Sequence, residues 1–211
     1  LQVDGSLRHS EIDLRQLVLD VTSGGASAGH VDFQGKFNLT NYTGAGTFKI
    51  ADFDQTVLRP VLAPSLGENQ LISIAVSGSG SASHDSKGDS VVKADVKVAN
   101  LVVADVQKKF PRTPLSAQMQ LDGSIRKQLF DLRQVALKLS PTARAQNELL
   151  LKGRIDLSAT NAAPSQLSLE SESLDLTTYY DLFAGTSGTN QPSPNPSAGA
   201  APQTNEPAPI D

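Results

Sequence analysis

The sequence of 211 residues contains no cysteine and no tryptophan, and aromatic residues make up only 5% of it. Without cysteine, the chain can form neither a disulfide framework nor a thiolate-bound metal site. No apolar run approaches the roughly 20 residues that a membrane-spanning helix needs. The chain also carries little excess charge, since 18 Lys and Arg face 22 Asp and Glu. Nucleic-acid-binding proteins carry a concentrated basic face, so this balance argues against nucleic acid as a partner.

Catalytic and cofactor-binding motifs are missing as well. The three histidines, His9, His30 and His84, lie in different segments and lack the spacing of metal ligands. Residues 25–29 match the G-x-S-x-G pattern of a nucleophile elbow, but we expect them in a loop between two strands, where that motif does not function. Residues 85–89 resemble only part of a calcium loop. We therefore expect a protein that is not an enzyme and that holds no metal and no cofactor.

An internal duplication organises what is present. The stretch QVDGSLRHSEIDLRQLVLDVT from residue 2 aligns without a gap with QLDGSIRKQLFDLRQVALKLS from residue 120, and 10 of the 21 positions are identical. Further along, FQGKFNL aligns with LKGRIDL, which places Gly35 on Gly153. After a shift of three residues, Asp54 aligns with Asp175. We therefore expect the two copies to share one structure.

The duplication divides the chain into three parts. Residues 1–64 correspond to the C-terminal part of a first repeat unit, and residues 65–184 to a complete second unit. Residues 185–211 are rich in Pro, Ser and Ala and have almost nothing apolar to bury, so we expect a disordered tail that is dispensable for folding. Because the first unit lacks its front half, we interpret the chain as a piece of a longer protein.

Alternation of apolar and polar residues dominates both units and is typical of strands in antiparallel sheets. We expect turns at the two Asp-Gly pairs, Asp4-Gly5 and Asp122-Gly123, and at polar breaks between the strands. The phase of the alternation changes between Leu14 and Leu17 and again between Leu132 and Val135, which predicts a bulge or a short turn at each DLRQ sequence. The alternating segments are residues 31–39, 72–76, 92–98, 115–121 and 149–157, and the polar breaks are residues 23–29, 41–46, 84–89 and 141–147.

Each unit is predicted to end in one short helix, capped by Asp54 before residues 55–62 and by Asp175 before residues 176–183. A single short helix cannot cover the apolar faces of so many strands. The sheet must therefore close on itself as a sandwich or barrel, or remain open as a trough. Gly35 and Gly153 lie in phase with the apolar residues, where a glycine lets a sheet bend toward that face or makes room for a bulky neighbour.

These repeated elements resemble those of the AsmA-like family of envelope proteins, which is related to the bridge-like lipid-transport proteins. The likeness covers residues 1–184. It is carried in each unit by a G-S-[LI]-R strand, a D-L-R-Q turn, a strand of the form [FL]-x-G-[KR]-[FI]-[ND]-L and a [FL]-D-[QL]-T segment before the helix. The family's N-terminal membrane anchor is absent here, and the tail ends without a further repeat.

The resemblance implies an all-β fold, in which two related units form an elongated, curved antiparallel sheet that is open as a trough. It further implies binding of phospholipid or another acyl-chain lipid in the periplasm, within a longer protein anchored to the inner membrane. The function would be phospholipid transport or outer-membrane assembly, together with other envelope proteins. The alternative is a closed β-sandwich that acts as a structural or adhesive spacer. We expect the groove to be lined by Val31, Phe33, Phe37, Leu39, Val96, Val98, Leu137, Leu149, Leu151, Ile155, Leu157, Leu167 and Leu169.

Overall fold

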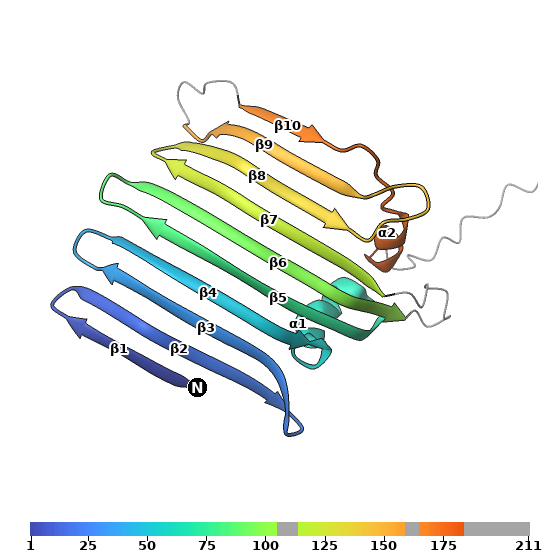
Figure 1. The fold of residues 1–211 in the computed structure, drawn as a ribbon, viewed down its shortest axis with the longest axis horizontal. Helices are drawn as coiled ribbons and strands as arrows, with labels where there is room; N and C mark the ends of the chain where they lie inside the picture. Colours follow the sequence, from blue (N-terminus) through green and yellow to red (C-terminus); the bar gives the residue numbers. More distant parts are fainter. Residues whose placement is uncertain (105–113, 159–164, 184–211) are drawn as a thin grey trace, which may run out of the picture.

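The structure is a computed structural model and describes residues 1–104, 114–158 and 165–183. Ten strands form one antiparallel sheet, in which every strand pairs with its neighbours in the chain (Figure 1). The strands are β1 (Gln2–Arg8), β2 (Glu11–Ser23), β3 (Ala26–Asn38), β4 (Thr43–Asp54), β5 (Gln70–His84), β6 (Asp89–Ala104), β7 (Leu115–Arg126), β8 (Leu129–Leu139), β9 (Glu148–Asp156) and β10 (Gln166–Glu170). The helices are α1 (Gln55–Leu66) and α2 (Thr177–Phe183).

The predicted open sheet is confirmed. Strands β1 and β10 form two separate edges, so these residues do not close into the sandwich or barrel that the sequence left possible. The predicted tail, residues 185–211, lies outside the described residues. Both α1 and α2 lie at the same end of the strands, whereas the β1–β2, β3–β4, β5–β6 and β7–β8 hairpin connections lie at the opposite end (Figure 1).

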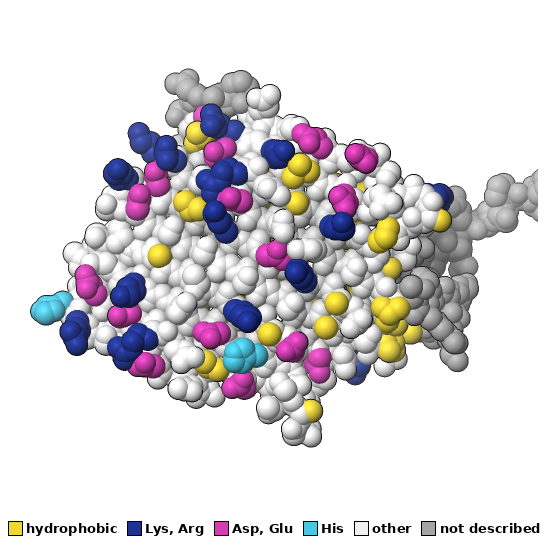
Figure 2. Space-filling view, in the orientation of Figure 1, with side chains coloured by type: hydrophobic (Ala, Val, Ile, Leu, Met, Phe, Trp, Pro, Cys, Tyr) yellow, Lys and Arg dark blue, Asp and Glu magenta, His cyan; other side chains and the backbone are white. Residues whose placement is uncertain are grey.

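The register gives the sheet one apolar face and one polar face, because paired residues on neighbouring strands point to the same side. One row of paired residues crosses all ten strands and contains only apolar residues and glycine: Val3, Leu17, Phe33, Phe48, Gly80, Ala94, Leu121, Val135, Leu151 and Leu169. Figure 2 shows the other face, over which basic and acidic side chains are spread. A row on that face runs through Gln34, Thr47, Ser81, Lys93, Asp122 and Gln134.

Each DLRQ sequence forms a bulge, as the change of phase predicted. Leu14 pairs with Gly35 but Leu17 pairs with Phe33, so two residues of β2 lie opposite one residue of β3. The same irregularity lies between Leu132 and Val135 in β8. The two bulges therefore occupy equivalent places in the two copies.

The prediction of turns at the Asp-Gly pairs is wrong. Asp4-Gly5 and Asp122-Gly123 lie inside β1 and β7, and the turns follow at His9-Ser10 and Lys127-Gln128. The aspartates serve a different purpose, because each one accepts a hydrogen bond from an arginine of the bulge on the next strand. The bonds run from Arg15 Nε to Asp4 at 2.9 Å and from Arg133 Nε to Asp122 at 2.8 Å. The other predicted breaks do contain the connections between strands, although the flanking strands extend into them.

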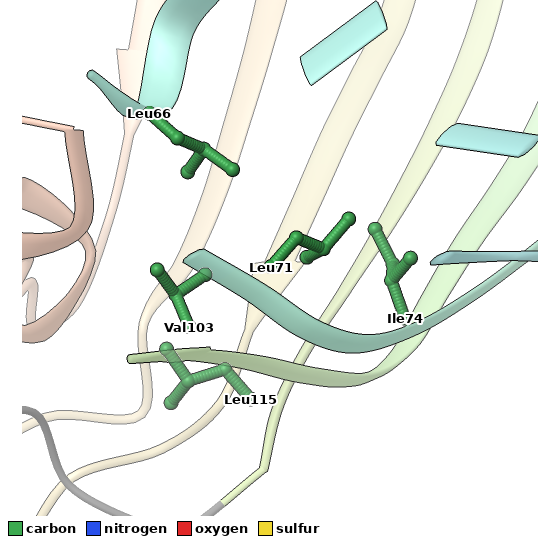
Figure 3. Packing of buried hydrophobic residues seen from close by; sticks show 5 residues of the cluster. All are labelled: Leu66, Leu71, Ile74, Val103 and Leu115. Atoms are coloured by element: carbon green, nitrogen blue, oxygen red, sulfur yellow. The ribbon is translucent and has the colours of Figure 1, made fainter. Parts of the chain in front are cut away.

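Helix α1 begins at the predicted cap. The Oδ1 atom of Asp54 accepts the backbone N–H of Thr56 at 2.8 Å, which satisfies one of the free donors at the helix start. The helix continues to Leu66, further than predicted, with Pro60 and Pro64 inside it. Its end packs on the sheet, and Figure 3 shows the side chain of Leu66 directed toward those of β5, β6 and β7. The buried cluster consists of Leu66, Leu71, Ile74, Val103 and Leu115.

Helix α2 follows Asp175 and is fastened to the sheet by polar contacts. The Asp175 carboxylate accepts the Thr177 hydroxyl at 2.7 Å. Tyr179 donates its hydroxyl to the carbonyl of Ser116 at 2.6 Å. Asn147, which is fully buried, accepts the backbone N–H of Asp175 at 2.6 Å. Both predicted helices are therefore present at equivalent positions, and Gly35 and Gly153 both lie in strands.

Candidate functional site

The apolar face of the sheet brings together most of the residues that the sequence assigned to a groove. Eleven of them lie in strands and share this face by register: Val31, Phe33, Phe37, Val96, Val98, Leu137, Leu149, Leu151, Ile155, Leu167 and Leu169. The other two do not belong to the strands. Leu39 and Leu157 lie just beyond the ends of β3 and β9, in hairpin connections, and are 52% and 60% exposed. The alternation continues into these turns, although the strand does not.

Most of this face is half-buried or exposed. The reason is that the sheet is a single layer, in which neighbouring side chains shield one another only from the side. Within the described residues, only the end of the strands near α1 has a covering layer. At the outer strands, Leu7 is 66% exposed and Leu169 is 64% exposed. Ten strands spaced about 4.8 Å apart extend over about 43 Å, so the face is far larger than the few hundred Å² of apolar surface that monomers usually expose.

Phenylalanine rings make the face smooth as well as apolar. All five phenylalanines with described side chains lie against a glycine: Phe33, Phe37, Phe48, Phe53 and Phe130. A Cβ atom at Gly44 would lie 2.6 Å from Phe37, and one at Gly80 would lie 2.5 Å from Phe48. Only glycine leaves room for a ring to lie this close over the neighbouring strand. The sequence signal, glycines in phase with the apolar residues, was visible at Gly35, but its aromatic partners were not predicted.

Hollows of about 770 and 610 Å³ lie on the polar face rather than on the apolar one. The larger has polar side chains from β7, β8 and β9 along its wall, including Gln118, Gln120 and Gln134. Both Gln118 and Gln120 donate their side-chain amides to Asp95, at 3.1 and 2.9 Å. These groups are paired with one another and do not form a nucleophile and base. Neither of these two hollows therefore lies on the apolar face.

The aspartates with a lowered pKa stabilise the strands and turns of the sheet. The guanidinium of Arg15 holds the pKa of Asp4 below its ordinary value through a side-chain hydrogen bond, and Arg133 does the same for Asp122. The backbone N–H of Asp89 lowers the pKa of Asp85, which closes the β5–β6 turn. Asp4 and Asp122 thus each join two neighbouring strands, and Asp85 stabilises a turn. Within residues 1–104, 114–158 and 165–183, no cluster of His, Asp or Glu has the arrangement of a metal site.

Several residues of the apolar face were not predicted from the sequence. They include Leu17, Phe48, Ile50 and Phe130, which lie in rows with the predicted ones. Their signal was the same alternation, but it could be read only once the bulges and the strand order were known. In β5, the alternation grouped Ile72 with Ile74 and Val76 on one face. Ile72 is 46% exposed and Leu71 is 1% exposed, because two irregularities between Leu71 and Ala75 shift the phase.

No family model, curated protein or solved structure matches this chain. None of the helices in the described part of the chain is long and apolar enough to cross a membrane.

Proposed function

We propose that the apolar face binds the acyl chains of lipids and thereby supports phospholipid transport or outer-membrane assembly in the periplasm. The observation that carries the proposal is the row of apolar residues and glycine that crosses all ten strands, from Val3 to Leu169. The resemblance to the AsmA-like family leads to the same class of ligand. The spacer alternative loses its support, because it required a closed sandwich.

The energetics favour such a ligand. Removing one methylene from water contributes about 0.8 kcal/mol, so an acyl chain crossing water faces a high barrier. A strand of 12 residues is about 40 Å long, which exceeds the length of an extended acyl chain. Transfer from a bilayer to an apolar protein surface is close to neutral, since both are apolar. The face can therefore receive a chain and release it without a catalytic step.

The shape of the face suits this role. Phe33 and Phe37 stack with their ring centroids 6.3 Å apart and their planes within 5° of one another. The rings lie over glycines of the neighbouring strand, so few side chains protrude into the path of an acyl chain that moves across them. A smooth surface without directional polar groups binds acyl chains of different length and unsaturation with similar strength. We therefore expect selectivity for the acyl part of lipids to be weak.

Photo-crosslinking tests the proposal with a matched pair of positions on β9. A photoreactive residue at Leu151 lies on the apolar face, and one at Arg154 lies on the polar face. The purified chain is incubated with vesicles of phosphatidylethanolamine and phosphatidylglycerol. We expect the residue at position 151 to capture lipid and the one at 154 to capture little. Equal capture at both positions, or none at 151, would contradict the proposal.

The substitution Leu151→Arg extends this test. Leu151 is half-buried in an open layer, so a long arginine side chain can reach water, and the sheet should keep its circular dichroism spectrum. Lipid capture at a second reporter position on the same face, Leu137, should fall several-fold. A control, Lys152→Arg on the polar face, should leave capture unchanged. An unfolded Leu151→Arg protein would instead indicate that the face is covered.

A further inference from the structure

The outer side of β1 forms one edge of the sheet, and no strand of the described chain pairs with it. Its counterpart in the duplication, β7, has β6 in that place. Apolar side chains show the difference: Leu7 in β1 is 66% exposed, whereas its counterpart Ile125 in β7 is 38% exposed. β1 therefore has the sequence of an internal strand at the position of an edge strand.

Three of the polar side chains of β7 that contact β6 are repeated in β1. In β7, these residues are Gln120, Asp122 and Arg126, and the residues at the same positions of β1 are Gln2, Asp4 and Arg8. Each of the three in β7 bonds to a different residue of β6. The contacts join Gln120 Nε2 to Asp95 at 2.9 Å, Lys93 Nζ to Asp122 at 3.6 Å, and Arg126 Nε to Asp89 at 2.8 Å.

In β1, only the contact on the side of β2 is made. Asp4 bonds to Arg15 of β2, as Asp122 bonds to Arg133 of β8. Within the part of the chain that the structure describes, no hydrogen bond or ion pair engages the side chain of Gln2 or Arg8, whose backbones pair with β2. The residues that would contact a strand of the β6 type are present, and the strand is not.

We propose that the edge of β1 binds an antiparallel strand of the β6 type, with the pattern Asp-x-x-x-Lys-x-Asp found at residues 89–95. In the register of β6 on β7, the first Asp lies opposite Arg8, the Lys opposite Asp4 and the second Asp opposite Gln2. The apolar residues of the incoming strand then extend the apolar face beyond Val3. The backbone supplies affinity, and the three polar pairs fix the register.

Two other arrangements fit less well. The opposite edge, β10, has only five residues, all exposed, and a short edge strand offers few backbone groups for pairing. In a second folded copy of the chain, β6 is already paired with β5 and β7 and cannot be donated. Pairing of β1 with β1 around Ser6 would place Asp4 opposite Arg8, but it aligns only residues 4–8 of the strand and leaves Gln2 beyond the paired stretch. The partner is therefore a strand that carries the acidic–basic–acidic pattern.

A graft tests the proposal. A copy of residues 65–118 is joined in front of Leu1, so that residue 118 of the copy precedes Leu1 as residue 118 precedes Met119 in the chain. We expect hydrogen–deuterium exchange of the β1 amides to slow at least tenfold, while exchange in β7, β8 and β9 is unchanged. The matched control graft carries Asp89→Lys, Lys93→Glu and Asp95→Lys in the copy only, and should protect β1 much less.

Exchanging charges between β1 and the added strand tests whether the polar pairs fix the register. Arg8→Glu in the grafted chain should weaken protection of β1, and adding Asp89→Lys in the copy should restore it. Should the graft disturb β7–β9, a peptide of residues 88–99 added to the unmodified chain measures the same exchange. The proposal is overturned if β1 exchanges equally fast with and without the added strand, or if the reversed graft protects β1 equally well. Protection of β1 in an unmodified chain that sediments as a dimer would identify a second copy as the partner instead.

Discussion

The apolar face has two regions with the same kinds of residue and very different burial. At the helix end, Leu71 and Val103 are 1% and 3% exposed under α1. At the outer strands, Leu7 and Leu169 stay largely exposed. Both regions belong to one sheet and one face, so side-chain type does not decide burial here; the covering helix does. The buried contacts are therefore concentrated at one end, and within the described residues the remainder of the face has no covering layer.

The largest expected effect comes from the covered region. Leu71→Ala leaves a cavity beneath α1 and should lower the free energy of unfolding by about 2–5 kcal/mol, a large part of the total for a domain of this size. The matched change Leu169→Ala removes the same atoms from an exposed site and should cost well under half as much. Urea unfolding of both variants, followed by circular dichroism, measures the difference. Equal losses would mean that the outer strands are covered in solution.

The attachment of β10, at one edge of the exposed region, depends on the backbone conformation of β9. Gly153 in β9 has φ +150°, and a Cβ atom there would lie 2.1 Å from the carbonyl oxygen of Gln166 in β10. Gly153→Ala should therefore detach β10 and cost about 1–3 kcal/mol. Gly123→Ala serves as the control, because its Cβ would lie 3.3 Å from the Phe130 ring without backbone strain. Hydrogen exchange in β10 distinguishes the two, and unchanged β10 protection in Gly153→Ala would show that the close approach relaxes.

The difference in burial between the two regions of the apolar face could not be predicted from the sequence. Alternation and duplication are local or internal signals, and they predicted the strands, the two faces, the bulges at DLRQ and the caps Asp54 and Asp175. Burial under α1 depends on where a helix lies over the sheet, which no periodicity encodes. Asp4-Gly5 failed as a turn because its aspartate is the partner of Arg15, a contact between strands that outweighs the local preference for a turn.

The same reason explains the errors within the candidate site. In β5, alternation grouped Ile72 with Ile74 and Val76 because it assumes an uninterrupted strand, and the irregularities of β5 exchange Ile72 with Leu71. Leu39 and Leu157 were assigned because alternation runs on past the last paired residue. The phenylalanine rings that lie against glycines of the next strand were not predicted either, because such neighbours are known only once the register is known.

A smaller effect is expected from the cap of α1, which holds the cover over the buried region. Asp54→Ala removes the acceptor for the N–H groups of Thr56 and Val57 and should cost about 0.5–2 kcal/mol. Asp32→Ala on the polar face of β3 is the control, with little expected change. Urea unfolding measures both. If Asp54→Ala loosens the amides of β10 more than those of β5, α1 is not what stabilises the covered region.

The smallest effect is expected from pH, acting on the second helix at the covered end. Hydrogen bonds from the Thr177 hydroxyl and backbone, then from Thr142, together with the charge of Arg144, hold the pKa of Asp175 below its ordinary value of 3.8. A carboxylate with a depressed pKa in the folded state contributes stability that is present above about pH 4 and lost as pH falls through the folded pKa. Acidification from pH 6 to below the folded pKa of Asp175 should therefore release α2, seen as nuclear magnetic resonance shifts of the Thr177 and Tyr179 amides. Leu71 and Ile74 should keep their protection, because α1 covers them.

Asp175→Asn should weaken the attachment of α2 at pH 6 and remove most of its pH dependence. If Leu71 loses protection together with α2, the two helices form one cooperative cover, and the buried region under α1 has no independent stability.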